Sequence, residues 1–346
     1  DRVTLSLEPG GRVSGNDVPI FVVGFQRSGT TLTQALLGAH SRIGAPPEMH
    51  FVFRVARFAG RYGDLTDDDN LRSVVHDALN PPANLFAECG YDEDRIFERA
   101  RRGDRTMRSV LDAVMSDFAE RRGKARWSEK SPGQSMAQVE SLFPDAQIIH
   151  IVRDPRDVIA SSLATPWTRN TAHTLAHRWR QFTVSNVRRG LLAGPTRFLQ
   201  LRYEDLTRDP EAVLRVVFAF LGERYEPEIL SDPDRRRDTI APSAAPWQRR
   251  ALEAVTPPTP SGWRTRLSRR DRLIVQSVFD RELAVLGYSQ APRKAIVAGR
   301  VLDQPIRAWD AIRKRWVGRR LGDPSRFELA IRDYLEEQAR IVQNHA

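Results

Sequence analysis

The sequence predicts an α/β fold in which a central parallel sheet is flanked by helices, and three observations predict it. Residues 19–24 and 147–152 are short, continuous apolar runs, which are typical of strands buried on both faces of a parallel sheet. A glycine-containing turn follows the first run and leads into a helical repeat of apolar residues. Farther along, strand-like and helix-like segments alternate, which favours parallel pairing through right-handed crossovers.

The expected elements follow in order along the chain. The first strand, at 19–24, is followed by a helix whose apolar face carries Leu32, Ala35, Leu36 and Ala39. A polar stretch over 64–104 breaks the pattern. Later strands are predicted at 126–129, 147–152 and 197–202, and later helices at 107–118, from 156 onward, at 213–221 and at 273–286. The segment 231–262 is rich in Pro, Ser, Thr and Arg and is predicted to be a long functional or mobile loop.

Composition places the chain among ordinary folded enzymes. Of its 346 residues, 40% are hydrophobic and 28% are charged, so a sizeable core can form. A net charge of +10 would attract an anionic ligand, a nucleic acid or a membrane surface. The single cysteine, Cys89, excludes an intrachain disulfide and a cysteine-based zinc site. Because no apolar stretch reaches the length of a membrane span, we expect a cytoplasmic protein in a reducing compartment.

An anion-binding loop is predicted directly after the first strand, at Gly24-Phe25-Gln26-Arg27-Ser28-Gly29-Thr30-Thr31. Backbone N–H groups and the dipole of the following helix favour an anion at such a place. The spacing is that of a Walker A loop, but Thr30 occupies the lysine position. An enzyme acting on nucleoside triphosphates needs that lysine for the β- and γ-phosphates. With its cation at Arg27 and paired hydroxyls at its end, the loop suits a 5′-phosphosulfate.

This loop resembles that of the sulfotransferase superfamily, which commonly reads P-x-x-S/R-S-G-T-T before an apolar residue. The matching residues are Arg27, Ser28, Gly29, Thr30, Thr31 and Leu32. The resemblance implies that Ser28 to Leu32 hold the 5′-phosphosulfate of 3′-phosphoadenosine-5′-phosphosulfate (PAPS), with Arg27 near the oxygen that bridges phosphorus and sulfur. It also implies a P-loop nucleotide-binding sulfotransferase domain over residues 19–288. Residues 289–346 would then form a helical extension packed on that domain or on a partner subunit.

A second anion site is predicted where the strand at 147–152 ends. Asp154 is placed to cap the next helix, and Arg153 and Ser161 could point at one phosphate; surface arginines on a capped helix are the plainer alternative. The segment resembles the superfamily's 3′-phosphate motif, R-D-P-R-D with a serine eight residues after its first arginine. The resemblance implies that Arg153 and Ser161 bind the 3′-phosphate.

Two further donor-binding residues are implied by the resemblance alone. Tyr203 begins a segment similar to the superfamily's Y-E-D-L, which would bring it to the adenine or the 3′-phosphate. Arg264 falls where members carry a basic loop over the 3′-phosphate.

Sulfonyl transfer needs a base for the acceptor's proton and cations for the charge on the leaving phosphate. Glu48 follows two prolines just beyond the first helix. Protein-tyrosine sulfotransferases carry their glutamate base at this distance, which implies this role for Glu48, with His50 and His150 as alternatives. Lys130 lies in a segment similar to the superfamily's E-K-[ST/D]-P, which implies that it stabilises the leaving group together with Arg27.

The resulting prediction is a PAPS-dependent sulfotransferase that needs no metal and releases adenosine-3′,5′-bisphosphate. Its acceptor would carry a hydroxyl group and be a small metabolite, carbohydrate, lipid or peptide rather than a nucleic acid. A P-loop kinase or NTPase-like enzyme and a catalytically silent module that binds nucleotide or acidic polymer are the alternatives.

Two features outside these motifs have structural interpretations. His173 and His177 have the i, i+4 spacing of a zinc pair, but without a nearby third ligand in the sequence we expect packing. In the tail, Ile306, Trp309, Ile312 and Trp316 form an apolar stripe among basic residues. We expect this stripe to dock on the domain or in a homo-oligomer, and binding of a membrane surface is the alternative.

Overall fold

The computed structural model of the chain describes residues 18–48, 55–80, 89–130, 133–165, 168, 170–241, 244, 246–257 and 262–320. The strands are β1 Ile20–Val23, β2 Ile43–Gly44, β3 Arg126–Glu129, β4 Gln147–Val152 and β5 Phe198–Arg202. The longer helices are α1 Thr30–Gly38, α3 Asp68–Leu79, α4 Glu93–Arg102, α5 Met107–Glu120, α6 Met136–Leu142, α7 Pro155–Leu163, α8 Ala172–Ala193, α10 Pro210–Leu221, α14 Arg269–Val278 and α16 Arg293–Arg320. The shorter helices are η1 Ala56–Arg61, α9 Tyr203–Arg208, α11 Glu228–Ser231, η3 Pro233–Thr239, α12 Pro246–Arg249, η4 Arg250–Leu252, α13 Trp263–Arg266 and α15 Asp280–Val285.

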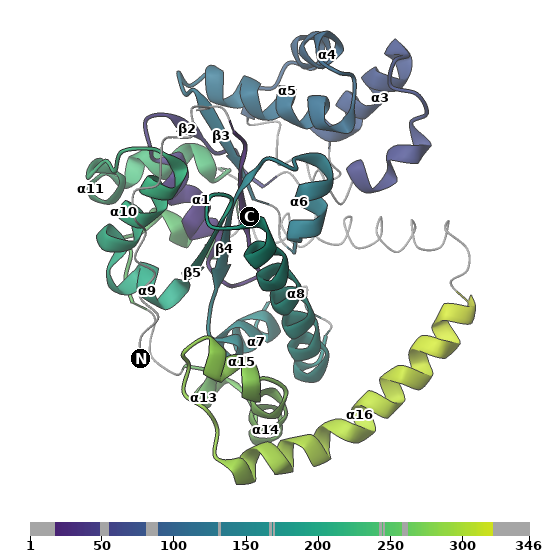
Figure 1. The fold of residues 1–346 in the computed structure, drawn as a ribbon, viewed down its shortest axis with the longest axis vertical. Coiled ribbons are helices and arrows are strands. Elements are labelled where there is room, and N and C mark those ends of the chain that lie inside the picture. The colour runs from purple at the N-terminus through teal and green to yellow at the C-terminus, as the bar shows by residue number, and fades with distance from the viewer. Residues whose placement is uncertain are drawn as a thin grey trace.

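The described strands form one parallel sheet in the order β2-β3-β1-β4-β5, with helices on both faces (Figure 1). Alternate residues of β1 point to opposite faces, as the period of a strand requires. Phe21 and Val23 join a core with α3, α4, α5 and α6. Ile20 and Val22 join a second core with α1 and α10. The predicted fold class is therefore confirmed.

The polar stretch over 64–104 is where the sequence-based prediction missed regular structure, because it contains α3 and α4. Helix α4 begins at the side-chain cap of Asp92, has acidic residues in its first turn and ends among arginines, which all favour a helix. Its buried residues are only Ile96, Phe97 and Ala100. So narrow an apolar stripe is difficult to recognise in a strongly charged segment.

Segment 231–262, which we expected to be a long loop, contains η3, α12 and η4 in its described part. Arg236 is fully buried at its centre. Its guanidinium donates hydrogen bonds to the carbonyl oxygens of Ile229 (3.0 Å), Ala251 (3.4 Å) and Glu253 (2.9 Å). Burial lowers the pKa of Arg236. One guanidinium thus joins Ile229, just before the segment, to Ala251 and Glu253 around η4. Both η3 and η4 pack against α1.

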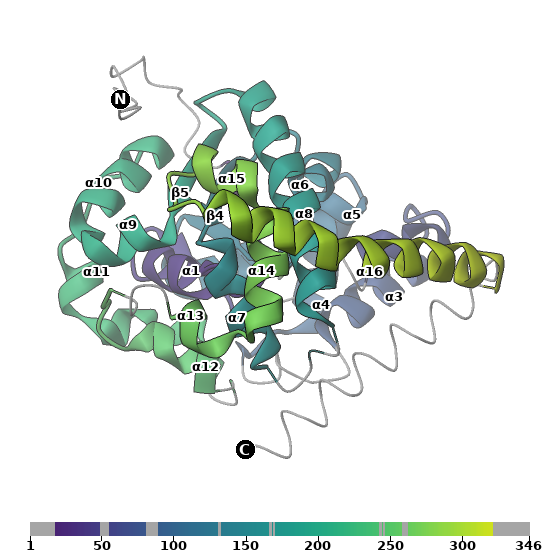
Figure 2. The same ribbon diagram turned by 90° about the horizontal axis from the view of Figure 1, so that it is seen from below.

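Helix α16 leaves the body of the fold in both views, beginning beside α14 (Figures 1 and 2). Leu302 and Ile306 pack against a third core, which α7, α8, α13, α14 and α15 share. The part of the expected extension around Leu302 and Ile306 therefore packs on the same chain. The side chains of Trp309, Ile312 and Trp316 lie outside the described residues. None of the described helices combines the length and apolar character that crossing a bilayer would need.

Candidate active site

The loop between β1 and α1 turns sharply at two residues with left-handed backbone conformations, Arg27 (φ 67°) and Gly29 (φ 101°). Gly29 caps α1, which begins at Thr30. A Cβ atom on Gly29 would lie 2.4 Å from Cδ2 of Tyr203, so the position requires glycine both for its backbone and for space. The first N–H groups of α1 lack partners within the helix, and this end of the helix favours an anion.

The predicted donor-binding residues of two separate motifs lie in direct contact. Because β1 and β4 are neighbours in the sheet, the segments after their carboxyl ends meet. Arg27 Nε donates a hydrogen bond to Ser161 Oγ of α7 (3.1 Å). Arg153 donates one to the carbonyl oxygen of Arg27 (3.3 Å), and its guanidinium carbon lies 4.5 Å from the centre of the Tyr203 ring. The structure thus brings Arg27, Arg153, Ser161 and Tyr203 together.

Positive charge is concentrated around Arg27. Burial lowers the pKa of Arg27, and the charges of Arg153 and Arg250 lower it further. Arg250 lies in η4 and was missed by the sequence analysis, because it belongs to no motif and stands in an arginine-rich stretch. Like charges held close together are costly, and an anion bound among them would offset that cost.

The candidate catalytic residues form a second group beside the same loop. Lys130, directly after β3, donates hydrogen bonds to Thr31 Oγ1 (3.1 Å) and to Glu48 Oε2 (2.8 Å). Gln248 Nε2 also donates to Glu48 Oε2 (3.3 Å). Lys130 and Glu48 are both nearly buried. The ammonium group therefore links the predicted base to the first turn of α1.

Glu48 and Lys130 line a pocket whose walls combine polar side chains with small apolar ones. One wall is formed by Pro46, Pro47 and residues of the first helix, and the opposite wall by segment 231–262. The described residues that line the pocket are Thr31, Gln34, Pro46, Pro47, Glu48, Lys130, Thr239, Ile240, Ala241, Ala244 and Gln248. The pocket therefore places a polar group of a bound molecule beside the paired carboxylate and ammonium group.

The remaining residues of the second motif, Asp154, Arg156 and Asp157, hold helix α7 and its neighbours in place through buried hydrogen bonds. Asp154 caps α7 and accepts hydrogen bonds from the backbone nitrogen and the guanidinium of Arg156. Only 3% of Arg156 is exposed, so the alternative of surface arginines is wrong for this residue. Asp157 accepts a hydrogen bond from Trp263 N (2.9 Å), which ties α13 to α7. Burial and the neighbouring Asp154 raise the pKa of Asp157.

Residues 19–227, more than half of the chain, match the model of the sulfotransferase family. The chain belongs to the sulfotransferase family. Among curated proteins, this sulfotransferase is 28% identical over 247 residues to omega-hydroxy-beta-dihydromenaquinone-9 sulfotransferase Stf3 of Mycobacterium tuberculosis. The matched region covers 60% of this chain and 63% of Stf3. It is 24% identical over 220 residues to protein-tyrosine sulfotransferase 2 of Gallus gallus, which covers 61% of the chain and 53% of that protein.

Solved structures support the same fold. The sulfotransferase domain of the Synechococcus PCC 7002 olefin synthase superposes with a TM-score of 0.56 at 24% identity, covering 81% of this sulfotransferase and 98% of that domain. At this identity, the likeness concerns the fold alone. The chain also spans less than two thirds of the length of the curated relatives named above.

Two of the predicted site residues, Arg264 and His150, stand apart from the two groups in this sulfotransferase. Arg264 lies in α13 with its guanidinium over the Trp263 ring, 4.6 Å from the ring centre. None of the hydrogen bonds described for the resolved ranges joins Arg264 to Arg27, Arg153 or Ser161. His150 is buried within β4 and stacks on Phe198, and burial lowers its pKa to about 4. His50 lies outside the described residues.

Proposed function

We propose that this sulfotransferase moves a sulfonate group from PAPS to a hydroxyl group of its acceptor, with Glu48 as the general base. The observation that carries the proposal is the position of Lys130, whose ammonium group contacts both Thr31 of the phosphate loop and Glu48. An acid–base group and a cation are thereby held side by side next to a loop suited to anions.

The residues around the loop fit a bound PAPS molecule. Ser28 Oγ is buried and makes no hydrogen bond with any described residue, so it has an unused donor in the loop itself. Arg27, Arg153 and Arg250 provide positive charge around it. We assign the 5′-phosphosulfate to residues 28–32, the 3′-phosphate to Arg153 and Ser161, and the adenine or the 3′-phosphate to Tyr203. Bound there, PAPS would supply the sulfonate group and a phosphate leaving group.

Each catalytic residue has a role that its contacts allow. Glu48 accepts the proton of the acceptor's hydroxyl group as that oxygen attacks sulfur. Lys130 and Arg27 balance the negative charge that develops on the leaving phosphate. None of these roles requires a metal ion at the pocket. We also propose Arg264 as a ligand of the 3′-phosphate. This proposal rests only on its position in the sequence, where family members carry a basic loop over that phosphate.

The acceptor would enter beside Glu48, along the wall formed by Ile240, Ala241 and Ala244. Stf3 and protein-tyrosine sulfotransferase 2 are named for very different acceptors, a menaquinone derivative and protein tyrosine. We therefore propose only a hydroxyl group on a small metabolite, carbohydrate, lipid or peptide. A small apolar wall favours an acceptor whose hydroxyl group stands next to uncharged atoms.

The test is a transfer assay with PAPS labelled at sulfur and a panel of hydroxyl acceptors of these four kinds. We expect label transfer without added Mg²⁺, inhibited by adenosine-3′,5′-bisphosphate. Calorimetry with that bisphosphate tests the donor site separately. Hydrolysis of ATP with Mg²⁺, combined with failure to bind the bisphosphate, would instead support the kinase or NTPase alternative. Binding of the bisphosphate with no transfer to any acceptor class would favour the silent binding module.

A further inference from the structure

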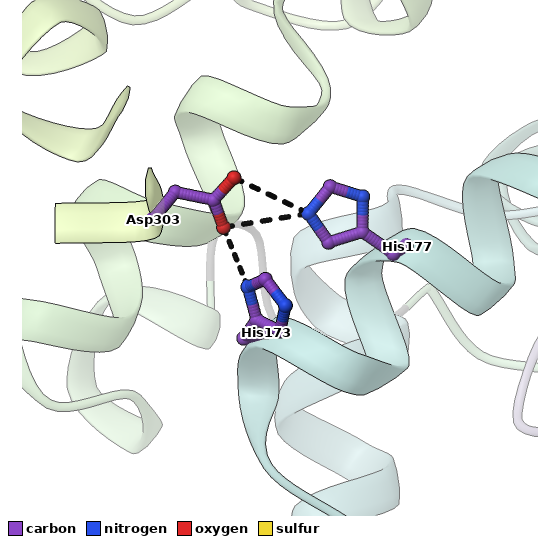
Figure 3. Close-up of side chains that lie close together, drawn as sticks. All are labelled: His173, His177 and Asp303. Atoms are coloured by element: carbon purple, nitrogen blue, oxygen red, sulfur yellow. Dashed lines mark hydrogen bonds and ion pairs between the residues drawn. The ribbon is translucent and has the colours of Figure 1, made fainter. Parts of the chain in front are cut away.

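A cluster of two histidines and one aspartate lies outside the pocket of Glu48 and Lys130. His173 and His177 stand one turn apart on α8, and Asp303 comes from α16. The carboxylate faces both imidazole rings and lies 2.5 Å from Nδ1 of His173 and 3.3 Å from Nε2 of His177 (Figure 3). The third residue that the sequence seemed to lack is therefore supplied from 130 positions farther along the chain.

The cluster is buried on one side and open on the other. Only 4% of His173 and 5% of Asp303 are exposed. His177, in contrast, borders a surface pocket together with Arg180, Ser277 and residues 280–282. A small ion and one water molecule can reach the cluster from that pocket, while the buried residues hold it in place.

The distances fit coordination of a metal ion. One candidate ligand atom from each residue lies within 4.8 Å of the others. A zinc ion about 2.0–2.2 Å from tetrahedral nitrogen and oxygen ligands separates neighbouring ligand atoms by roughly 3.3–3.5 Å. His177 Nε2 lies 3.3 and 3.4 Å from the two carboxylate oxygens. His173 Nδ1 lies 2.5 Å from Asp303, so it would have to move away by about 1 Å to reach the same ligand spacing.

Charge around the cluster selects the class of metal. Among the described residues, the pocket is lined by four arginines and three carboxylates: Arg180, Arg281, Arg300 and Arg307, with Asp280, Glu282 and Asp303. Their field does not attract cations, so affinity must come from coordinate bonds. Imidazole nitrogens bind zinc and similar transition metals far better than they bind Mg²⁺ or Ca²⁺.

We propose that His173, His177 and Asp303 bind one divalent transition metal ion of the zinc class, with water in the fourth position. The ion joins α8 of the sulfotransferase domain to α16 and so holds the start of the C-terminal helix on the fold. Its ligands are distinct from the residues proposed for sulfonate transfer, so the two proposals can fail separately.

The test uses the full chain, without an affinity tag and stripped of metal by a chelator. Calorimetry with Zn²⁺ should give one site per chain, and Co²⁺ should give the visible absorption of a four-coordinate ion. Zn²⁺ should also raise the melting temperature. Asp303→Asn and the less buried His177→Gln should each weaken Zn²⁺ binding by at least about tenfold, since even residues behind the ligands contribute 10- to 100-fold.

Two matched variants serve as controls. Asp280→Asn changes a carboxylate in the same pocket that pairs with Arg300, and His76→Gln changes an exposed histidine on α3. Both should bind Zn²⁺ as the wild type does. Absence of stoichiometric binding by the wild type would overturn the proposal, as would equal binding by Asp303→Asn and His177→Gln. The circular dichroism spectrum of each metal-free variant establishes that a loss of binding is not a loss of fold.

Discussion

Arg27 Nε donates a hydrogen bond to Ser161 Oγ, 134 positions away, at 3.1 Å. This bond joins the loop after β1 to α7, the helix that follows β4. The loop proposed for the 5′-phosphosulfate and the segment proposed for the 3′-phosphate are therefore parts of one continuous site. A substitution of either residue should therefore weaken binding of both the 5′ and the 3′ end of a bound nucleotide.

Arg153→Ala should weaken the binding of adenosine-3′,5′-bisphosphate by about 1.5–3 kcal/mol, roughly 10- to 150-fold, because a charge-assisted hydrogen bond is lost. Calorimetry should also show that the variant binds the bisphosphate and adenosine 5′-monophosphate almost equally. Arg215→Ala, which removes an arginine paired with Glu211 on the surface of α10, is the control. If the wild type already binds the two nucleotides equally, the 3′-phosphate is assigned to the wrong residues.

Glu48→Gln should bind the bisphosphate normally but lose roughly 10²–10⁴ in turnover, the usual effect of removing a general base. The amide keeps the shape of the side chain and can still accept a hydrogen bond from Lys130. Steady-state kinetics with labelled PAPS measure the effect, and Glu253→Gln, at an exposed position, is the control. A parallel loss of donor affinity would show that Glu48 supports the pocket instead. His50→Ala should be much milder, and the reverse ranking would transfer the role of base to His50.

Gly29→Ala should weaken bisphosphate binding and lower stability, because its Cβ atom would collide with the Tyr203 ring. Gly123→Ala is a matched control: Gly123 also has a positive φ, but a Cβ atom there meets nothing within 4 Å. Both variants carry the backbone cost of about 1–2 kcal/mol for a left-handed residue. Only Gly29→Ala should also bind the bisphosphate more weakly. If Gly29→Ala and Gly123→Ala bind the bisphosphate equally well, there is no donor site at this loop.

His150 should make the protein less stable in acid. Its pKa is lowered to about 4 in the folded state, against 6.5 for a solvated histidine. Between these two values the unfolded chain binds the proton and the folded chain does not, so stability falls as pH falls from 6.5 to 4. The loss attributable to this residue is about 3 kcal/mol. Urea unfolding at several pH values should show a shallower decline for His150→Leu than for the wild type, whereas His76→Gln should follow the wild type.

Deleting residues 300–346 should lower the melting temperature or cause aggregation, because the deletion removes Leu302 and Ile306 from the core shared with α8 and α14. The intact protein should not bind anionic liposomes. Thermal unfolding, size-exclusion chromatography and liposome sedimentation measure these outcomes. Salt-sensitive liposome binding by the intact chain, lost in the truncated one, would instead support a membrane-surface helix.

The sheet and the phosphate loop could be predicted from the sequence because their signals are local. Apolar runs identify the strands β1 and β4, and the left-handed turn before α1 follows from Gly29 and its neighbours. The contact between Lys130 and Glu48 is different, because it depends on where β3 places the lysine relative to residues 82 positions earlier. Motif resemblance selected both residues, but only the fold shows that they touch.

Contacts from distant segments without a motif could not be predicted. Asp303 is one of two acidic residues in a basic helix, and nothing in the sequence connects it with His173. Arg250 is one arginine among many, and it reaches Arg27 only because segment 231–262 folds back on α1. In both examples, the partner is determined by packing of the chain rather than by local spacing.

The burial of Arg236 has a consequence for how this protein can diversify. The segment that contains Arg236 provides five of the eleven described residues that line the pocket, all between Thr239 and Gln248. Arg27 and Arg153, which we propose bind the donor, instead follow the ends of β1 and β4. Substitutions between 239 and 248 can thus change the shape of the pocket beside Glu48 without altering Arg27 or Arg153. This requires that Arg236 is retained, because it holds the segment together. Evolution, or a chimera that exchanges this stretch with a relative, could accordingly change the acceptor while retaining the same donor.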